Sequence, residues 1–576
     1  MKRNATVALS ALSALLLASS LGLAGCNNSS TDTSSDSDAT TTESADGYDL
    51  EYTDRDCDPS YDESAATKIT LGDDSISVDG EGVSTDGSTA TITAEGVYIV
   101  SGTLTDGQLV VDADDAKVQV VLDGANITCS SGPAIYVKQA KKTFVTLADG
   151  SENSLADGSS YELTDEDDDS GEPEAALFSK DDLTLQGGGS LTVTGNCKHA
   201  VVSKDDLVIT GGTYKITAVT DGLRGKNCVK IKDGDFTIET GEDSVKSNED
   251  SEEYKGFVLI DGGTFDVTAG DDAFHAETAL FVNGGDVTVN TCYEGYEGQT
   301  IYIAGGNSNI TATDDAVNAA TGGTSGSDMQ NPDDMGANHM QDQGMGPDGN
   351  GDMGNGGGQA PSEPGNGNGS GTGGTAPASD ESASGTGLAQ TAYAEGMGGG
   401  MDVDSSCELV ISGGTLIVDA AGDGLDSNGS FTMTGGTVIV NGPTSGGDGA
   451  LDYGSTASIS GGTIIAVGSS QMAEGFTEGE QAFALVSAEG NAGDEVRILD
   501  ADGNELATMT ATKNFQSVVI STDGMTAGTY QLVIGSNSAE FEASTEATNA
   551  FSSNDIGGQM QPMGNGGGQQ GGGQRP

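Results

Sequence analysis

Short segments of alternating hydrophobic and polar residues recur along most of the chain, and many follow a glycine-rich turn. In residues 264–268, Phe265 and Val267 alternate with polar residues, and in 435–440 a Gly-Gly turn leads into Thr437, Val438, Ile439 and Val440. Such segments are too short and too rich in β-branched residues to be helices. The pattern therefore predicts strands that each turn one face toward a core.

The glycine-rich turns recur at a regular interval. They fall at Gly188, Gly212, Gly234, Gly263, Gly285, Gly306, Gly414, Gly436 and Gly462. From Gly212 onward the successive spacings are 22, 29, 22, 21, 108, 22 and 26 residues. A period near 22 predicts the stacked coils of a solenoid. The leucine-rich and nonapeptide repeat patterns are missing, so we expect an all-β protein, a right-handed parallel β-helix of about 22 residues and three short strands per coil.

Shifts in composition divide the chain. Residues 65–320 and 400–479 carry the strand pattern and predict the two parts of one β-helix. The stretch 321–399 is rich in Gly, Asn and Met and predicts a disordered insertion. Residues 480–545 predict a small C-terminal cap of antiparallel β-strands, and 546–576 a disordered tail.

The N-terminus has the order of an export signal. Lys2 and Arg3 precede an apolar stretch over 7–23, which ends at Cys26. The sequence around Cys26 resembles the bacterial lipoprotein box, which implies lipidation of Cys26 after removal of the signal peptide (1–26). We expect 27–64 to be a disordered tether that holds the protein at the cell surface through a lipid anchor in the membrane. An ordinary secretory signal is the alternative.

The formal charge of −69 limits the partners. Ninety Asp and Glu residues face 21 Lys and Arg residues. Such a charge disfavours binding to nucleic acid and strains a compact fold by self-repulsion. We expect no nucleic-acid partner, and a monomer.

Apart from Cys26, six cysteines are scattered along the chain without any Cys-x-x-Cys pair, which argues against a thiolate metal site. They are Cys57, Cys129, Cys197, Cys228, Cys292 and Cys407. We expect small buried residues, with a disulfide involving Cys57 as the alternative.

Acidic pairs recur with the same period as the strands. Asp271–Asp272, Asp314–Asp315 and Glu242–Asp243 each precede a short apolar step. Stacked coils would place these carboxylates above one another, and two carboxylates about 4 Å apart repel by about 1 kcal/mol even in water. The recurrence therefore favours a neutralising cation.

An ordered series of motifs carries a family resemblance. The motifs occupy 270–276, 292–298, 314–320, 422–429 and 449–453. Together they resemble the carbohydrate-binding domain-containing bacterial surface proteins first described in a cellulolytic clostridium, over residues 65–545. The resemblance implies a parallel β-helix with pectate-lyase-like architecture that binds calcium and plant cell-wall polysaccharides, cellulose and polygalacturonate.

Calcium would allow an acidic protein to bind an acidic glycan, because Ca²⁺ takes six to eight oxygen ligands and can join protein and sugar carboxylates. We expect nine calcium ligands: Asp221, Asp243, Asp271, Asp272, Glu294, Glu297, Asp314, Asp315 and Asp423. The alternative is that these residues only form turns. With no Trp in the chain, stacking on a sugar would fall to Tyr293 and Tyr296, which could equally anchor loops.

Two rival functions remain. A pectate lyase would need Ca²⁺ with a Lys or Arg as base, and Arg224 and Lys246 occupy equivalent places in consecutive repeats. These two residues could equally neutralise neighbouring carboxylates, and His275 shares their repeat position. The other rival is a structural adhesin. We favour a non-catalytic, lipid-anchored protein that binds an acidic plant cell-wall polysaccharide through calcium.

Overall fold

The structure, a computed structural model, describes residues 47–161, 173–321, 403–444 and 446–547. Residues from Asp49 onward belong to one compact unit, and only this unit is considered below. Its described part contains 40 strands and no helix, which confirms the all-β prediction. None of the described residues forms a helix long and apolar enough to cross a bilayer.

Most strands pair in parallel with a strand about one coil later in the chain, in three series. The first, series A, contains β4(Thr89–Ile92), β6(Gln108–Asp112), β8(Ile135–Gln139), β11(Ala175–Ser179), β14(His199–Ser203), β17(Leu223–Gly225), β20(Val245–Ser247), β23(Phe274–Val282), β25(Tyr296–Ile303), β27(Val317–Ala319) and β30(Asp426–Ser427).

Series B begins with the first described strand and also includes the second halves of β23 and β25. Its other members are β1(Thr67–Gly72), β5(Gly96–Leu104), β7(Lys117–Cys129), β9(Lys142–Leu147), β12(Leu183–Gly187), β15(Asp206–Ile209), β18(Cys228–Ile231), β21(Phe257–Ile260), β28(Glu408–Ile411), β31(Ser430–Met433), β33(Ala457–Ile459) and β35(Glu478–Gly490).

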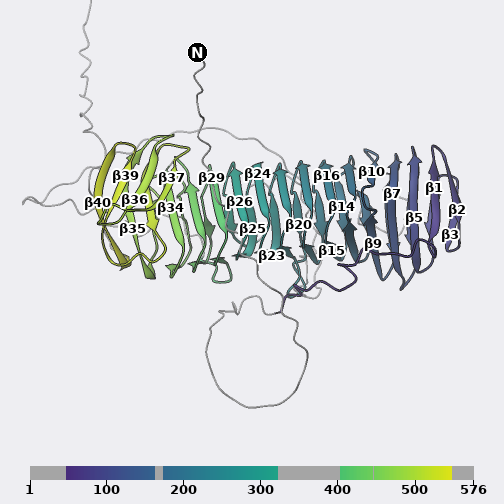
Figure 1. The fold of residues 1–576 in the computed structure, drawn as a ribbon, viewed down its shortest axis with the longest axis horizontal. Coiled ribbons are helices and arrows are strands. Elements are labelled where there is room, and N and C mark those ends of the chain that lie inside the picture. The colour runs from purple at the N-terminus through teal and green to yellow at the C-terminus, as the bar shows by residue number, and fades with distance from the viewer. Residues whose placement is uncertain (1–46, 162–172, 322–402, 445, 548–576) are drawn as a thin grey trace, which may run out of the picture. The chain divides into compact units, whose positions relative to one another are not determined.

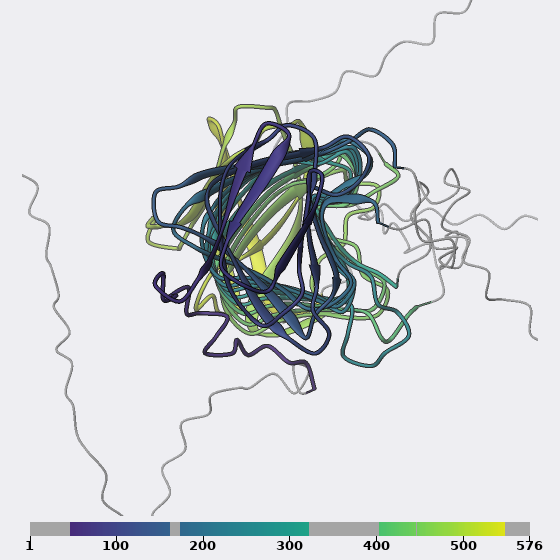
Figure 2. The same cartoon turned by 90° about the vertical axis from the view of Figure 1, so that its right-hand side faces the viewer.

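Series C starts from the second half of β7. It continues through β10(Glu152–Asp157), β13(Ser190–Gly195), β16(Thr213–Ala218), β19(Asp235–Thr240), β22(Thr264–Thr268), β24(Asp286–Cys292), β26(Asn307–Ala312), β29(Thr415–Ala420), β32(Thr437–Asn441) and β34(Thr463–Gly468). Figure 1 shows the paired strands in a row, and Figure 2 shows successive coils superimposed around one core.

Antiparallel pairs flank the parallel series. Near the N-terminal strands, β2(Ser75–Asp79) pairs with β1, and β3(Val83–Asp86) with β4. At the other end, β35 and β34 pair with β38(Phe515–Ser521). The remaining strands β36(Glu495–Leu499), β37(Glu505–Thr510), β39(Gly528–Ile534) and β40(Asn537–Glu546) complete the antiparallel pairing, and their inward side chains form a second core with β35 and β38.

The main core is a stack of inward side chains, one layer per coil. In series C, Tyr214, Phe236 and Phe265 stack face to face with ring centroids 5.1 and 4.7 Å apart. Phe274 and Tyr296 continue the aromatic stack edge to face, each contact with centroids 5.5 Å apart. Aromatic pairs add about 0.5–1.5 kcal/mol beyond the area that they bury, so this ladder helps to fix the coil register.

The Gly-Gly turns let successive coils approach closely. At Gly414 the backbone has φ of 76°, and a Cβ atom there would lie 2.6 Å from the carbonyl oxygen of Gly305 in the coil before. Only glycine takes this conformation without strain and fits this space. The repeated turn residue is therefore a requirement of stacking.

A segment over residues 49–60, which we call the strap, crosses the outside of series B. Lys230 donates to the carbonyl oxygens of Asp49 and Glu51, and the Gln119 amide donates to that of Pro59. Asp56 is 2% exposed and pairs with Lys142 at 2.8 Å. The strap thus touches β18, Thr210 directly after β15, and then β12, β9 and β7.

The strap corrects one prediction. The disordered tether predicted for 27–64 is wrong for residues 49–60, because buried hydrogen bonds and an ion pair hold this segment on the coils. The predicted signal peptide with Cys26 lies outside the described residues. So do the predicted insertion, except for residue 321, and the predicted C-terminal tail, except for residues 546 and 547.

All six described cysteines are unpaired. Cys57 is exposed and Cys197 half-buried, whereas the other four are buried. The prediction of small buried residues therefore holds for four of the six, and the described residues contain no disulfide.

Candidate functional site

Three columns of side chains line the edge where each series A strand begins. The outer column follows the strand register and holds Val202, Arg224, Lys246, His275, Glu297, Asn318 and Asp426. The inner column lies three residues earlier in each coil and holds His199, Asp221, Asp243, Asp272, Glu294, Asp315 and Asp423. The rim column lies one residue before that and includes Glu242, Asp271, Tyr293 and Asp314. Adjacent strands are about 4.8 Å apart, so each column brings its side chains close together.

Several inner carboxylates also hold the backbone of the next coil. Asp243 accepts a hydrogen bond from the amide of Asp272 at 3.0 Å, and Asp315 accepts one from the amide of Asp423. Asp423 in turn accepts one from Gly449. The carboxylates are therefore fixed in position by the turns, whatever else they bind.

The first coils of the columns, which we call the paired section, neutralise their own charge. In this section Asp221 pairs with Arg224 at 2.9 Å and Asp243 with Lys246 at 2.6 Å. His199 also lies 3.1 Å from Asp221. Each carboxylate is 1% exposed, so an unpaired charge would be costly there.

The pKa values in the paired section reflect this pairing. Burial alone would raise the pKa of Asp221, but the hydrogen bond from His199 and the charges of His199, Arg224 and Lys246 lower it well below the ordinary value. Burial alone would lower the pKa of Lys246, but Asp243 and Asp221 raise it. The section is therefore held as fixed ion pairs.

The next coil forms a boundary. His275 places Nδ1 3.1 Å from Asp272 and in a short contact with Glu297. Burial opposes a charged imidazole, yet the charge of Glu297 raises the pKa of His275. Burial would also raise the pKa of Glu297, but His275 lowers it to about 2. Burial raises the pKa of Asp272.

Beyond His275 lies the acidic section, defined as Glu294, Asp314, Asp315, Asn318, Asp423 and Asp426, with Glu297 at its border. Within the described part of the chain, none of the ion pairs involves Glu294, Asp315, Asp423 or Asp426. Burial and neighbouring carboxylates raise the pKa of Glu294 to about 9 and those of Asp315, Asp423 and Asp426 to about 8. The section thus holds carboxyl groups whose charges nothing in the described protein balances.

Two sets of ligand atoms meet across neighbouring coils. Asp272, Glu294 and Glu297 offer oxygens that all lie within 4.8 Å of one another, as do ligand atoms of Asp243, Asp272 and His275. Asn318 donates to Glu294 at 3.0 Å, and its own Oδ1 is buried with no hydrogen-bond partner among the described residues. An amide oxygen so placed can serve as a further cation ligand.

The structure sorts the nine predicted ligands. It brings Asp272, Glu294 and Glu297 together, and it leaves Asp314, Asp315 and Asp423 in the acidic section. Asp221 and Asp243 instead carry ion-pair partners, and Asp271 lies in the rim column, where burial and Asp243 raise its pKa to about 6. The prediction that Arg224 and Lys246 share a repeat position agrees with the register.

The two predicted sugar-binding tyrosines differ. Tyr293 is half-buried in the rim column, next to Asp314. Tyr296 is fully buried, packs on Phe274 and bonds to Ser308 through its hydroxyl. The prediction for Tyr296 is therefore wrong, because its ring lies in the core and no sugar can reach it.

Sequence reasoning missed two groups of acids. Asp426 was not among the predicted ligands, although it follows Leu425 as Arg224 follows Leu223. Asp182, Asp205 and Asp206 also bring carboxylate oxygens within 4.8 Å of one another, at the start of series B strands. Their signal is the repeated Lys-Asp-Asp-Leu at 180–183 and 204–207.

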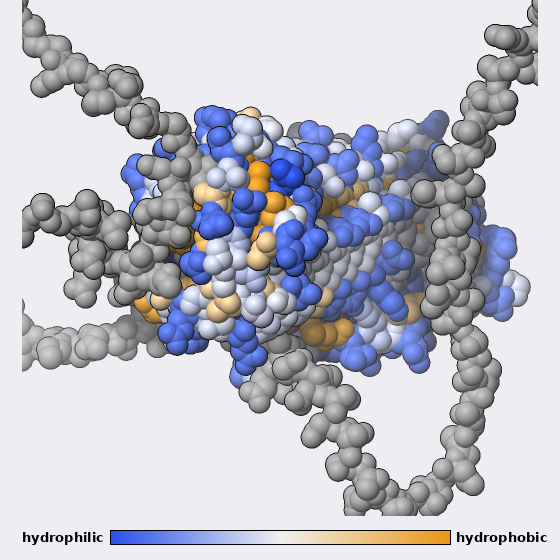
Figure 3. All heavy atoms as spheres, turned by 60° about the vertical axis from the view of Figure 1, so that its left-hand side comes forward, coloured by the Kyte–Doolittle hydropathy of each residue, from blue (hydrophilic) through white to orange (hydrophobic). Residues whose placement is uncertain are grey.

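Among the described residues, few large hydrophobic side chains are exposed. Figure 3 shows scattered hydrophobic residues among hydrophilic ones. The exposed large hydrophobic residues, such as Val219, Ile417 and Leu506, come from separate segments. Single exposed hydrophobic residues of this kind are ordinary.

Comparison with known proteins gives three matches. The family "Carbohydrate-binding domain-containing protein" matches residues 86–333. A protein of that description from Acetivibrio thermocellus is 38% identical over 225 residues, which are 39% of this chain and 78% of the relative. A solved structure, described as the polysaccharide lyase-like protein from C. thermocellum in a gadolinium derivative, is 36% identical and covers 42% of this chain and 93% of that chain, with a TM-score of 0.38.

Proposed function

Because the chain belongs to the family of carbohydrate-binding domain-containing proteins, we propose that it binds an acidic polysaccharide, such as polygalacturonate, through calcium ions held by the acidic section. The observation that carries the proposal is the stack of Glu294, Asp315, Asp423 and Asp426, which have raised pKa values and no ion-pair partner among the described residues. Cellulose is a further candidate glycan.

The proposed fold is a right-handed parallel β-helix with coils of about 22 residues. Support comes from the parallel pairing and from register partners such as Leu223 with Val245, which are 22 residues apart. Parallel crossover connections are right-handed in about 98% of cases. The fold matters because it sets the carboxylates one strand spacing apart.

Calcium suits the ligands of the acidic section. Ca²⁺ prefers carboxylate and amide oxygens in a flexible geometry. Glu294 and Glu297 with the free Oδ1 of Asn318 supply such oxygens at one place. When bound, calcium would supply the positive charge that lets sugar carboxylates approach a chain of net charge −69.

The paired section argues against a lyase. A base for uronide elimination must accept a proton near neutral pH. The ion pair with Asp243 raises the pKa of Lys246 and keeps the amine charged, and the Arg224 guanidinium is bound to Asp221. We therefore propose a non-catalytic binding protein and keep lyase activity as an outcome of the test.

The location proposed is the bacterial cell surface, with a lipid on Cys26 as anchor. The support for it is the signal-like segment and the lipoprotein box alone, which lie outside the described residues. Labelling of the protein with a radioactive fatty acid, with Cys26→Ser as control, tests this part of the proposal.

The glycan proposal is tested by co-sedimentation with insoluble polygalacturonate in calcium and in chelator. We expect binding in calcium, loss in chelator, and loss in the double variant Glu294→Gln/Asp315→Asn. The matched control is Glu239→Gln/Asp235→Asn, which changes the same two residue types at exposed positions of β19. Binding that survives chelator would overturn the calcium bridge, and an unsaturated product absorbing in the ultraviolet would show a lyase.

The same assay separates a glycan-binding protein from a structural adhesin. A structural adhesin would bind calcium through the acidic section but would not sediment with any polysaccharide. Calcium binding by calorimetry without co-sedimentation would therefore support the structural reading and contradict ours.

A further inference from the structure

The edge that carries the acidic section changes character toward the N-terminal coils. The inner-column positions there are Gly107 and Pro133, and the outer-column positions are Val110 and Tyr136. The carboxylates and basic side chains of the later coils are thus replaced by small, apolar and aromatic residues at the same place in the coil. A cation site is not built there.

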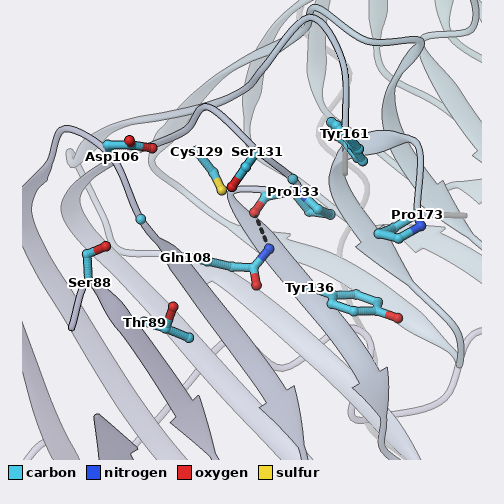
Figure 4. A pocket seen from close by; sticks show the side chains of 12 residues that line it. Ser88, Thr89, Asp106, Gln108, Cys129, Ser131, Pro133, Tyr136, Tyr161 and Pro173 are labelled. Atoms are coloured by element: carbon cyan, nitrogen blue, oxygen red, sulfur yellow. Dashed lines mark hydrogen bonds between the residues drawn. The ribbon is translucent and has the colours of Figure 1, made fainter. Parts of the chain in front are cut away.

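A cavity of about 250 Å³ opens at this neutral end. Figure 4 shows Ser88 and Thr89 on one side, Tyr136, Tyr161 and Pro173 on the other, and Gln108 between them. The Gln108 amide donates to the carbonyl oxygen of Pro133 at 2.7 Å, which fixes its side chain in the cavity. The volume is below the roughly 300–1,000 Å³ that is usual for drug-sized ligands, so the cavity suits one ring rather than an extended chain.

The lining combines two kinds of group. Tyr136 is 7% exposed and packs edge to face on Phe178, and the Tyr161 hydroxyl donates to Asp157 and bonds to the Ala175 carbonyl. Both rings are therefore rigidly placed. Ser88 and Thr89 stand opposite them, and Ser131 also lines the cavity (Figure 4). Aromatic surface with a few fixed polar groups is the usual composition of a specific small-molecule site.

The charge of the lining selects among sugars. Of the described residues that line the cavity, Asp106 is the one carboxylate, and none is Lys, Arg or His. Asp106 is already engaged by the amide and hydroxyl of Ser130, both at 2.9 Å. No group there can neutralise a uronate, and the net charge of −69 repels one.

We infer that this cavity binds one neutral sugar ring without calcium, and that it forms a second glycan subsite on the edge that carries the acidic section. The inference rests on the proposed function only for the class of ligand, a polysaccharide. Tyr136 lies six strand steps from Glu297 along series A, which is roughly 29 Å at about 4.8 Å per strand. A short saccharide therefore reaches one subsite and not both.

The experiment is calorimetric titration of the full-length protein with cellotetraose and mannotetraose as neutral probes and trigalacturonate as acidic probe, each in chelator and in calcium. We expect at least one neutral probe to bind equally in both conditions, and trigalacturonate to bind only in calcium. Failure of trigalacturonate alone would contradict the proposed function and leave the cavity standing. If neither neutral probe binds, the inference that the cavity binds a neutral sugar is wrong.

The variant Gly132→Leu fills the cavity. Gly132 does not have positive φ, and an added Cβ would lie 3.3 Å from the Gln108 amide nitrogen, a tight contact that a small shift of the Gln108 side chain would relieve. We expect weakening of neutral-sugar binding by about tenfold or more, equivalent to about 1.4 kcal/mol. The control is Gly211→Leu at a different turn, where the added Cβ meets the carbonyl oxygen of Gly187 at 3.3 Å.

A second variant protects the test against misfolding. Gln108→Leu removes the amide from the cavity and leaves an apolar side chain that is one methylene shorter. We expect it to weaken neutral-sugar binding several-fold and to leave calcium-dependent binding of trigalacturonate unchanged. Neutral-sugar binding that stays at the wild-type level in folded Gly132→Leu or Gln108→Leu protein would overturn the inference.

Discussion

The paired section and the acidic section share one backbone and differ by one side chain per coil. Where the outer column supplies Arg224 or Lys246, the buried carboxylate beside it is a fixed ion pair. Where it supplies Asn318 or Asp426, the carboxylates have raised pKa values and no ion-pair partner among the described residues. One repeat position therefore decides whether the buried carboxylates of a coil have a cationic partner within the described protein.

The largest effect should come from breaking a pair in the paired section. Lys246→Met leaves Asp243 buried without a counter-charge, and removal of one partner of a buried pair costs about 3–5 kcal/mol. Thermal unfolding measures the loss. Lys215→Met at an exposed position of β16 is the control and should change stability little. Equal stability of the two variants would show that the pairing is not needed.

Removal of calcium should affect the other section. A ligand at 100 times its Kd stabilises the folded state by about 2.7 kcal/mol, so we expect the Tm to fall by several degrees when chelator is added. The double variant Glu294→Gln/Asp315→Asn should lose this response, whereas Lys246→Met should keep it. A calcium response that survives the double variant would place the ion elsewhere.

The pH dependence should separate the sections when calcium is chelated. The folded pKa of Glu294 is about 9 and that of Asp315 about 8, above the ordinary values near 4. Their contribution to stability is therefore fully present below about pH 4 and is lost progressively as the pH rises to 8 and 9. We expect the Tm in chelator to be lower at pH 9 than at pH 6, and this difference to shrink in the double variant. An unchanged difference would contradict the assignment.

A cation placed in the acidic section should convert it toward the paired type. Asn318→Lys puts an amine into the outer column beside Glu297 and Asp426. We expect calcium affinity, measured by calorimetry, to fall about tenfold, equivalent to about 1.4 kcal/mol. Asn309→Lys, an equal change of charge at an exposed position of β26, is the control.

The smallest effect concerns Tyr296, which the structure removes from the sugar-binding surface. Tyr296→Phe loses the buried hydrogen bond to Ser308 and should cost about 0.5–1.5 kcal/mol in unfolding free energy. Glycan binding should stay the same. A loss of glycan binding at unchanged stability would instead show that Tyr296 takes part in sugar binding.

The repeat made much of this comparison predictable from sequence. The 22-residue spacing places Arg224 beside Lys246, and the register agrees. The same spacing places Tyr296 beside Phe274, and the hydrophobic character of that position points to the core. Attention to that alternation could have excluded Tyr296 as a ligand for sugars.

Other features had no periodic signal. Asp56 lies in a stretch whose composition resembles a tether. Its two partners, Thr184 and Lys142, lie 128 and 86 residues further along the chain. The cavity depends on side chains from β4, β6 and β8 that meet only after the coils stack. Which predicted carboxylates already have cation partners depends on distances of a few ångströms, which spacing alone does not provide.

The strap has a consequence for how the chain folds. In a stack of coils each repeat ordinarily touches only its neighbours, so the ends can open independently. Here a segment before the first coil is anchored on Lys230, about 180 residues later, by hydrogen bonds of 3.1 and 2.9 Å. The strap therefore cannot complete its contacts until β18 has emerged, and closure of a loop of that length is slow. Once formed, the strap joins the coils from β7 to β18, so that these coils open together rather than one at a time.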